Sequence, residues 1–174
     1  PISHDQEEAF ELADRVVVMG EGRIEQIGNA DQIHDHPASP FVARFMGATI
    51  ELPVTLVSGR AEAPGLDAGR LPRRALPDGP ATLFLRPDDV VPVADPAGRW
   101  QVARCTSNGA VLRIDLTDGH RQIPVDLPRR APEARGLCKG TCVTLRAEAG
   151  AIFSAGRDEP AVSVAPFPRK ENRL

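Results

Sequence analysis

Beyond residue 47 the sequence consists of short β-patterned segments interrupted by proline and glycine clusters. The 174 residues include 17 prolines and 15 glycines, which break up any long helix or strand in this region. Several short strands at close spacing favour a small β barrel or sandwich, with a core built from Val, Leu, Ile and Ala. Apolar or alternating runs predict these strands at residues 50–57, 81–86, 100–106, 111–116, 122–127, 141–147 and 151–153.

Two segments of the same region lack any regular pattern. Residues 60–80 are rich in proline, glycine and arginine without periodicity, so we expect an exposed loop there. Residues 154–174 contain further prolines and are expected to form a flexible tail. In contrast, Asp118-Gly119 lies between two alternating runs and indicates a tight hairpin turn.

The first 47 residues have a mixed pattern. Ser3 and the glutamine three positions later fit a capping box for a helix over residues 5–13. Residues 16–27 form two apolar runs around a Gly-Glu-Gly turn, which predicts a hairpin. Residues 29–33 and 39–47 each begin with a good N-cap and predict two short helices. This segment is therefore expected to be an α/β fragment.

Charge and cysteine content exclude several classes of protein. Lys and Arg number 21 against 24 Asp and Glu, so the formal net charge of −3 gives no basic field for binding nucleic-acid phosphates. The three cysteines are odd in number, and no basic stretch followed by an apolar leader is present, which favours a reducing, cytoplasmic compartment. No apolar run approaches the roughly 18 residues that a membrane-spanning helix needs.

An ordered set of short motifs near the start of the chain is the strongest functional signal. The motifs lie at residues 3–9, 13–19, 22–28 and 41–47. Their sequence and order resemble the end of the nucleotide-binding domain, a P-loop fold, of ABC transporter ATPases of the importer subclass. The resemblance implies that His4 is the switch histidine of the H-loop, a catalytic residue that contacts the γ-phosphate of ATP and helps position the attacking water.

The position of His4 is compatible with this role. A histidine just ahead of a helix N-terminus lies where backbone N–H groups and the helix dipole favour an anion. A neutral imidazole can donate a hydrogen bond to a phosphate oxygen without adding a full charge. The alternative interpretation is a surface histidine beside a helix cap.

The rest of the ATPase machinery is missing from the sequence. It contains no Gly-x4-Gly-Lys-Ser/Thr loop to cradle phosphates and Mg²⁺, no glycine-rich signature motif and no apolar strand ending in Asp-Glu. Phosphoryl transfer depends on that positioning, so we do not expect this chain alone to hydrolyse ATP. ATP and Mg²⁺ are expected as cofactors only of a complete transport ATPase, of which the chain resembles the C-terminal part. No metal site of its own is predicted.

The β region resembles a second unit of the same transporters. Residues 83–90 form an apolar strand followed by Arg-Pro and two acids, like a motif of the OB-like TOBE domain that follows many importer ATPase domains. Residues 109–127 and 140–146 look most like the sulfate/thiosulfate importer branch, although spermidine/putrescine, iron and sugar importer ATPases share the H-loop region. The expected units are residues 1–47, a remnant of a nucleotide-binding domain, residues 48–153, a TOBE regulatory domain, and residues 154–174, the tail.

The resemblance also implies an assembly. In such importers two ATPase subunits lie under two membrane permease subunits, at the cytoplasmic face of the cell membrane, and a solute-binding protein delivers the cargo. We therefore expect these partners, with a homodimer made chiefly by the β region, and no nucleic acid.

Two clusters of potential metal ligands have open interpretations. Cys138 and Cys142 have a spacing that zinc sites use, but they fit core or incidental cysteines better. His34 and His36 flank an aspartate and could bind a metal, although a solvated loop before a proline is the stronger expectation.

An oxyanion-sensing module is the alternative of another functional class, because OB-like barrels also bind small ligands. The turn at residues 106–109 and the side chain of Arg86 are the candidate anion-binding groups. Arg86 at a strand end is more often paired with an acid such as Asp88 or Asp89. We expect neither group to form a closed site, because the turn should be exposed to competing water.

Overall fold

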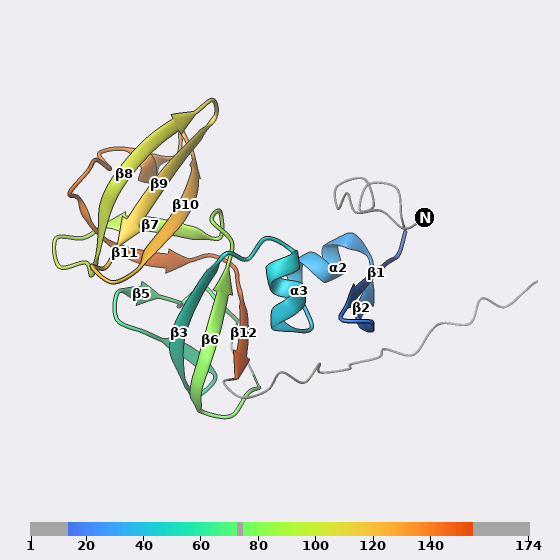
Figure 1. The fold of residues 1–174 in the computed structure, drawn as a ribbon. Coiled ribbons are helices and arrows are strands. Elements are labelled where there is room, and N and C mark those ends of the chain that lie inside the picture. The colour runs from blue at the N-terminus through green and yellow to red at the C-terminus, as the bar shows by residue number, and fades with distance from the viewer. Residues whose placement is uncertain (1–13, 73–74, 155–174) are drawn as a thin grey trace, which may run out of the picture.

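The computed structural model describes residues 14–72 and 75–154 (Figure 1). Most of the ordered elements are strands, as the sequence predicts, and one sheet curls into a half-barrel that is compatible with a β-barrel domain. The predicted helix over residues 5–13, His4 and all but the first residue of the predicted tail lie outside the described residues. No helix in the described part is long and apolar enough to cross a membrane.

The N-terminal segment is a hairpin followed by two short helices, as predicted. Strands β1 (Val16–Gly20) and β2 (Arg23–Gly28) pair antiparallel, and Glu21 and Gly22 take the positive φ angles that a tight hairpin turn needs. Helix α2 (Ala30–Asp35) begins with a complete capping box at Asn29. Helix α3 (Pro40–Phe45) begins with the Ser39 cap and a proline in its first turn.

A four-stranded antiparallel sheet forms the part of the β region nearest the helices (Figure 1). Its order is β12-β6-β3-β4, so the last described strand pairs with one from the middle of the chain. Buried and exposed residues alternate along β3, which gives this strand one core face and one solvent face. The strands are β3 (Ile50–Val57), β4 (Arg60–Glu62), β6 (Gly79–Leu85) and β12 (Ala151–Ser154).

The second sheet has the path β10-β9-β8-β11-β5, and β7 pairs with the other edge of β11. It curls until the backbone N–H of Asp126 in β10 donates to the carbonyl of Pro87, just ahead of β7, at 2.8 Å. A single-turn 3₁₀ helix (Pro132–Ala134) precedes β11. The strands are β5 (Leu66–Asp67), β7 (Val90–Ala94), β8 (Trp100–Asn108), β9 (Val111–Thr117), β10 (Gln122–Pro128) and β11 (Cys142–Ala147).

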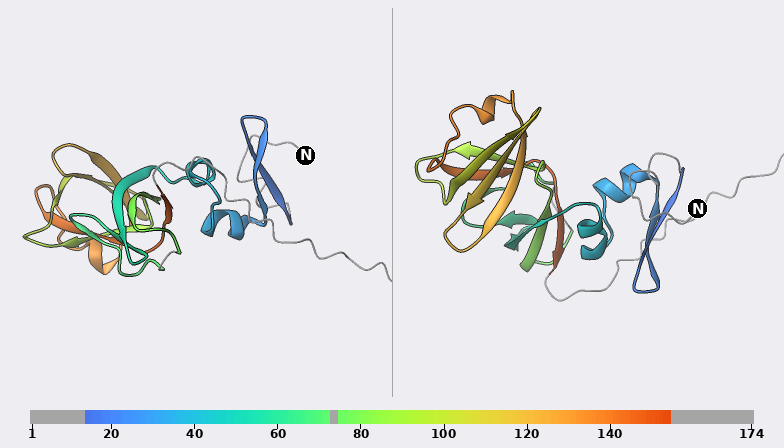
Figure 2. Two further views of the ribbon diagram at one scale, coloured as in Figure 1. Left: turned by 90° about the horizontal axis from the view of Figure 1, so that it is seen from below. Right: turned by 45° about the horizontal axis from the view of Figure 1, so that its top comes forward.

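One apolar core joins the two sheets. It takes Leu83 and Leu85 from β6, and strands of the curled sheet supply further fully buried residues such as Ile114 and Leu145. Phe84 points to the opposite face of its strand and packs with Ala43 of α3 in a separate small cluster. The views in Figure 2 accordingly show the helices between the β region and the N-terminal hairpin.

The expectation of an unstructured exposed loop over residues 60–80 is wrong in part. Strand β4 pairs with the end of β3 and buries Ala61, and β5 pairs in parallel with β11. Both are too short to show a periodic pattern, and the partner of β5 lies about 80 residues further along the chain. Strand β7 was not predicted either.

Candidate functional site

Arg86 lies at the junction between the helices and the β region, and its side chain makes three hydrogen bonds there. It follows β6, and its side chain is only 13% exposed. Its Nε donates to the carbonyl of Met46 at 2.9 Å and its Nη2 to the carbonyl of His34 at 2.5 Å. Its Nη1 contacts Asp89 Oδ2 at 3.3 Å. One guanidinium thus joins two helices to one strand end.

The charge of Arg86 fits this position. His34 lies in the last turn of α2, and Met46 is the C-cap of α3, so both carbonyls belong to helix ends that carry partial negative charge. Asp89 also accepts the backbone N–H of Arg86 at 3.0 Å, which fixes the carboxylate beside the guanidinium. Of the two sequence alternatives, pairing is therefore confirmed, with Asp89 as the partner, and the donors of Arg86 are already engaged.

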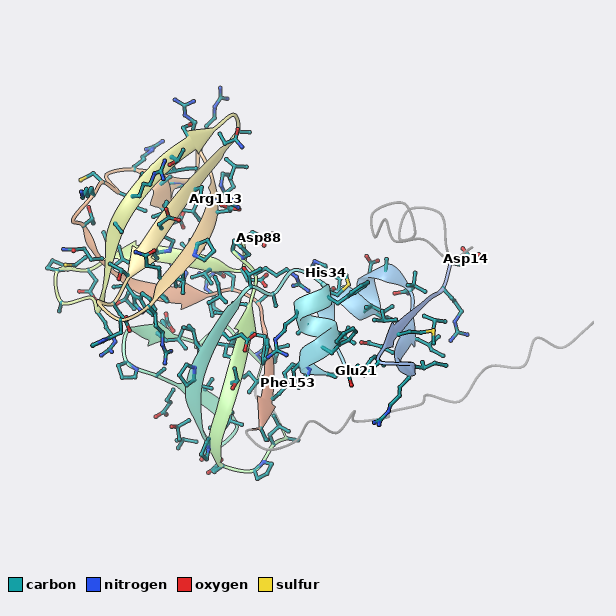
Figure 3. All side chains as sticks on the ribbon, viewed as in Figure 1. Asp14, Glu21, His34, Asp88, Arg113 and Phe153 are labelled. Carbon is teal, nitrogen blue, oxygen red and sulfur yellow. The ribbon has the colours of Figure 1, made fainter. Side chains whose placement is uncertain are left out.

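A second polar contact supports the same junction. Arg44 in α3 forms a bidentate ion pair with Glu51 in β3, with N···O distances of 2.6 and 3.0 Å. The Arg44 guanidinium also lies over the Phe84 ring, 5.2 Å from its centroid. Hydrogen bonding from Arg44 lowers the pKa of Glu51. Phe84 in turn makes an edge-to-face contact with Phe153 of β12, which Figure 3 labels.

A cavity of about 290 Å³ lies at this junction, lined by His34, Phe84, Arg86 and Asp89 among others. His34 Nδ1 lies 2.9 Å from Asp35 Oδ1, and this hydrogen bond lowers the pKa of Asp35. Both side chains are exposed, but they lie in the last turn of α2, so the expectation of a solvated loop holds for their exposure and is wrong for their secondary structure. No group of three potential metal ligands occurs in the described part of the chain. The contacts at this junction join and position elements and provide no nucleophile paired with a base.

The other sequence candidates lie away from the junction. Cys142 is half-buried in β11, whereas Cys138 is exposed and contacts Thr141. Burial is the main cause that raises the pKa of the third thiol, Cys105, whose Sγ donates to a backbone carbonyl. The 106–109 segment is exposed throughout, as expected, and its first three residues belong to β8, which ends two residues beyond the predicted strand.

The chain is similar in sequence to several sulfate/thiosulfate import ATP-binding proteins. It is 43% identical over 156 residues to the sulfate/thiosulfate import ATP-binding protein CysA 1 of Rhizobium meliloti, a match covering 87% of this chain and 44% of that protein. It is 40% identical over 169 residues to CysA 2 of the same organism, covering 92% and 44% of the two chains. The corresponding protein of Brucella melitensis is 37% identical over 162 residues, covering 91% and 44%.

This chain is a homologue of the sulfate/thiosulfate import ATP-binding proteins. The resemblance to ABC importer ATPases seen in the sequence is thereby confirmed. The chain spans less than half the length of these relatives. No protein-family model matches it.

In this homologue of import ATP-binding proteins, the sequence predicted only part of the junction between the helices and the β region. It named Arg86 and, as its acidic partner, Asp88 or Asp89, because both acids lie within three residues of Arg86. It missed the carbonyl partners, which lie 40 and 52 residues away from Arg86 in the chain. Any residue type can supply a backbone carbonyl, so these two acceptors could have been predicted only from their positions at helix ends.

Proposed function

We propose that this chain is the C-terminal part of the ATP-binding subunit of an ABC importer, with sulfate or thiosulfate as the transported anion. The names of its homologues support the substrate class, and the motif order in the first 47 residues supports the ATPase assignment. The spermidine/putrescine, iron and sugar alternatives have no comparable support among these relatives.

The observation that carries the proposal is the hairpin apolar face, formed by Val17, Met19, Ile24 and Ile27. Val17 lies opposite Ile27 and Met19 opposite Ile24, so all four side chains share one face of the hairpin. These side chains are 42–60% exposed, and no other described residue buries them.

The other face of the hairpin already has a core. Val18 is buried against Ile33 of α2 and Val42 of α3. A two-stranded hairpin with apolar residues on both faces needs a layer on each side. The remaining part of a nucleotide-binding domain would supply the missing layer in a complete subunit, since the relatives are more than twice as long as the region matched here.

In this proposal the units have separate roles. Residues 1–47 complete the nucleotide-binding domain and present His4 to the γ-phosphate, with ATP and Mg²⁺ held by parts of the subunit that precede this chain. Residues 48–153 form the TOBE regulatory and dimerisation domain. The partners are a second ATP-binding subunit, two permeases and, indirectly, a solute-binding protein at the cytoplasmic face of the membrane. Arg86 and the Arg44–Glu51 pair would transmit movement between the two units.

A chimera tests the ATPase assignment. The region of Rhizobium meliloti CysA 1 matched by this chain is replaced with this chain, and ATP turnover and nucleotide binding are measured with Mg²⁺. We expect turnover by the chimera and none by this chain alone. His4→Ala should lower turnover of the chimera with a smaller effect on nucleotide binding. Turnover by this chain alone that His4→Ala abolishes would contradict the proposal.

The hairpin apolar face gives a second measurement on the same two proteins. Met19→Gln with Ile24→Thr should leave the stability of this chain unchanged, since both side chains are exposed, but should destabilise the chimera and lower its turnover. Val57→Thr with Val111→Thr is the matched control, because these exposed apolar residues lie in the β region. Equal effects of the two double variants on the chimera would refute the assignment of this face.

Growth tests the transported anion. In Rhizobium meliloti lacking both CysA proteins, the chimera should restore growth on sulfate as the sole sulfur source. Failure of a chimera that hydrolyses ATP would contradict the substrate while leaving the ATPase assignment intact.

A further inference from the structure

A second cavity of about 290 Å³ lies in the β region, away from the helix junction. One wall is apolar and comes from β3 and the segment after β4, with Leu52, Pro53, Pro64 and Leu66. The polar lining residues come from the residue just before β8 and from the turn between β9 and β10. A volume near the lower end of small-molecule sites, roughly 300–1,000 Å³, fits a small metabolite.

The polar side of this cavity carries an excess of positive charge. Arg99, His120 and Arg121 line it, and Asp118 is the single acid among the lining residues. The Asp118 side chain is 7% exposed and accepts the backbone N–H groups of His120 at 3.0 Å and Arg121 at 2.8 Å, which lower its pKa. Its negative charge is therefore largely satisfied by its own turn.

The two arginines keep donor capacity for a ligand. Arg99 contacts Asp118 through Nη2 alone, at the long distance of 3.4 Å. The Arg121 guanidinium has no hydrogen-bond or ion-pair partner among the described residues, and its side chain lies on an exposed turn. Two arginines in the lining of one cavity form an arrangement suited to a carboxylate or another oxyanion.

A buried donor lines the same cavity. Trp100 is 4% exposed, and its indole N–H finds no acceptor in the described part of the chain. A Cβ at Gly65 would lie 3.3 Å from this nitrogen, so the N–H edge faces the segment that carries Pro64 and Leu66. A buried donor without a partner is rare in proteins and destabilising. The indole nitrogen is covered by the fold, so an acceptor brought by a ligand removes that cost only if the segment at Gly65 moves aside.

We propose that this cavity, framed by Trp100, Arg99 and Arg121, binds a small organic anion. The carboxylate would accept hydrogen bonds from the guanidinium groups and, after a shift of the segment at Gly65, from the indole N–H, and an apolar body would lie against the leucine and proline wall. The site differs from both anion candidates of the sequence, the 106–109 turn and Arg86. It does not depend on ATP or on the transport assignment.

The chain provides its own reporter for this site. Trp100 is the only tryptophan and the chain has no tyrosine, so indole emission arises from the cavity wall. The chain is titrated with isovalerate, which has an apolar body, with acetate, which lacks one, with sulfate and thiosulfate, and with chloride at matched ionic strength. We expect a saturable change with isovalerate at a Kd below about 1 mM, weaker binding of acetate and no saturation with chloride.

Matched arginine variants test the geometry. Arg121→Ser should weaken isovalerate binding about tenfold or more, because it removes a charge-assisted hydrogen bond. Arg130→Ser makes the same charge change at an exposed position outside the cavity and should leave binding unchanged. Calorimetry with Trp100→Phe, after a check of its unfolding midpoint, should show weaker binding, because the phenyl ring has no N–H.

Three outcomes would overturn the proposal. The first is no saturable response to isovalerate up to about 10 mM. The second is equal weakening by Arg121→Ser and Arg130→Ser, which would indicate a nonspecific charge effect. The third is tight binding of sulfate or thiosulfate without binding of isovalerate, which would make the cavity an inorganic oxyanion site. None of these results bears on ATP turnover by the chimera, so the two proposals fail separately.

Discussion

Replacing Arg86 by methionine tests whether one side chain holds the helices on the β region. The change keeps most of the aliphatic stem and removes three hydrogen bonds, two to helix-end carbonyls and one to Asp89. Hydrogen bonds from charged groups contribute roughly 1.5–3 kcal/mol each, but those made by one side chain are not additive. We expect Arg86→Met to lower the free energy of unfolding by about 3 kcal/mol, because it also leaves a half-buried carboxylate without its cation.

Urea denaturation measures this destabilisation, and Arg113→Met is its matched control. Arg113 makes a bidentate pair with Asp126, with N···O distances of 2.8 and 2.7 Å that are shorter than the 3.3 Å between Arg86 and Asp89. Its side chain, however, is 57% exposed and lies on the outer surface (Figure 3). Solvent screens such a pair, so its removal should have a much smaller effect.

Amide hydrogen exchange locates the effect of Arg86→Met. Exchange should accelerate in α2 and α3 and stay unchanged in β8 and β9, because the Arg86 guanidinium donates to carbonyls at the ends of these two helices. If Arg86→Met destabilises the chain no more than Arg113→Met, or if exchange accelerates equally everywhere, the junction does not depend on this side chain and the reasoning is refuted.

Two further outcomes follow from local geometry. Gly98→Ala should cost about 3 kcal/mol or more of unfolding free energy, since its Cβ would lie 2.3 Å from the Val143 carbonyl carbon, whereas Gly109→Ala, at φ +60° in open space, should cost about 1 kcal/mol; equal urea midpoints would contradict this. Because hydrogen bonding to Arg44 lowers the pKa of Glu51, this pair stabilises the fold above the ordinary Glu pKa and the effect disappears as pH falls. Glu51→Gln should therefore flatten the acid side of the stability profile measured by urea unfolding at several pH values, and an unchanged slope would refute it.

Elements that depend on local signals were predictable from the sequence. The hairpin turn at Glu21-Gly22, the Asn29 capping box and the Ser39 cap each involve residues within a few positions of one another. The predicted strand at residues 50–57 coincides with β3, whose residues alternate strictly between core and solvent.

The candidate sites were harder to predict from the sequence. His4 rests on a family resemblance, and it lies outside the described residues. Arg86 was recognisable as a strand-end arginine with acids nearby, but its role at two helix ends was not. No pattern in the sequence marks Trp100 as part of a site, although the structure places it with two arginines in the lining of one cavity.

The sequence by itself determined where chain direction changes and which face of each strand is apolar, because caps, glycine turns and alternation act between near neighbours. Only the tertiary structure decided which distant segments meet. It paired β5 with β11, brought Arg86 to two helix ends and set Arg99 and Arg121 beside one indole. Such contacts arise when separate apolar faces close on a common core, and their partners have no fixed spacing in the chain from which they could be predicted.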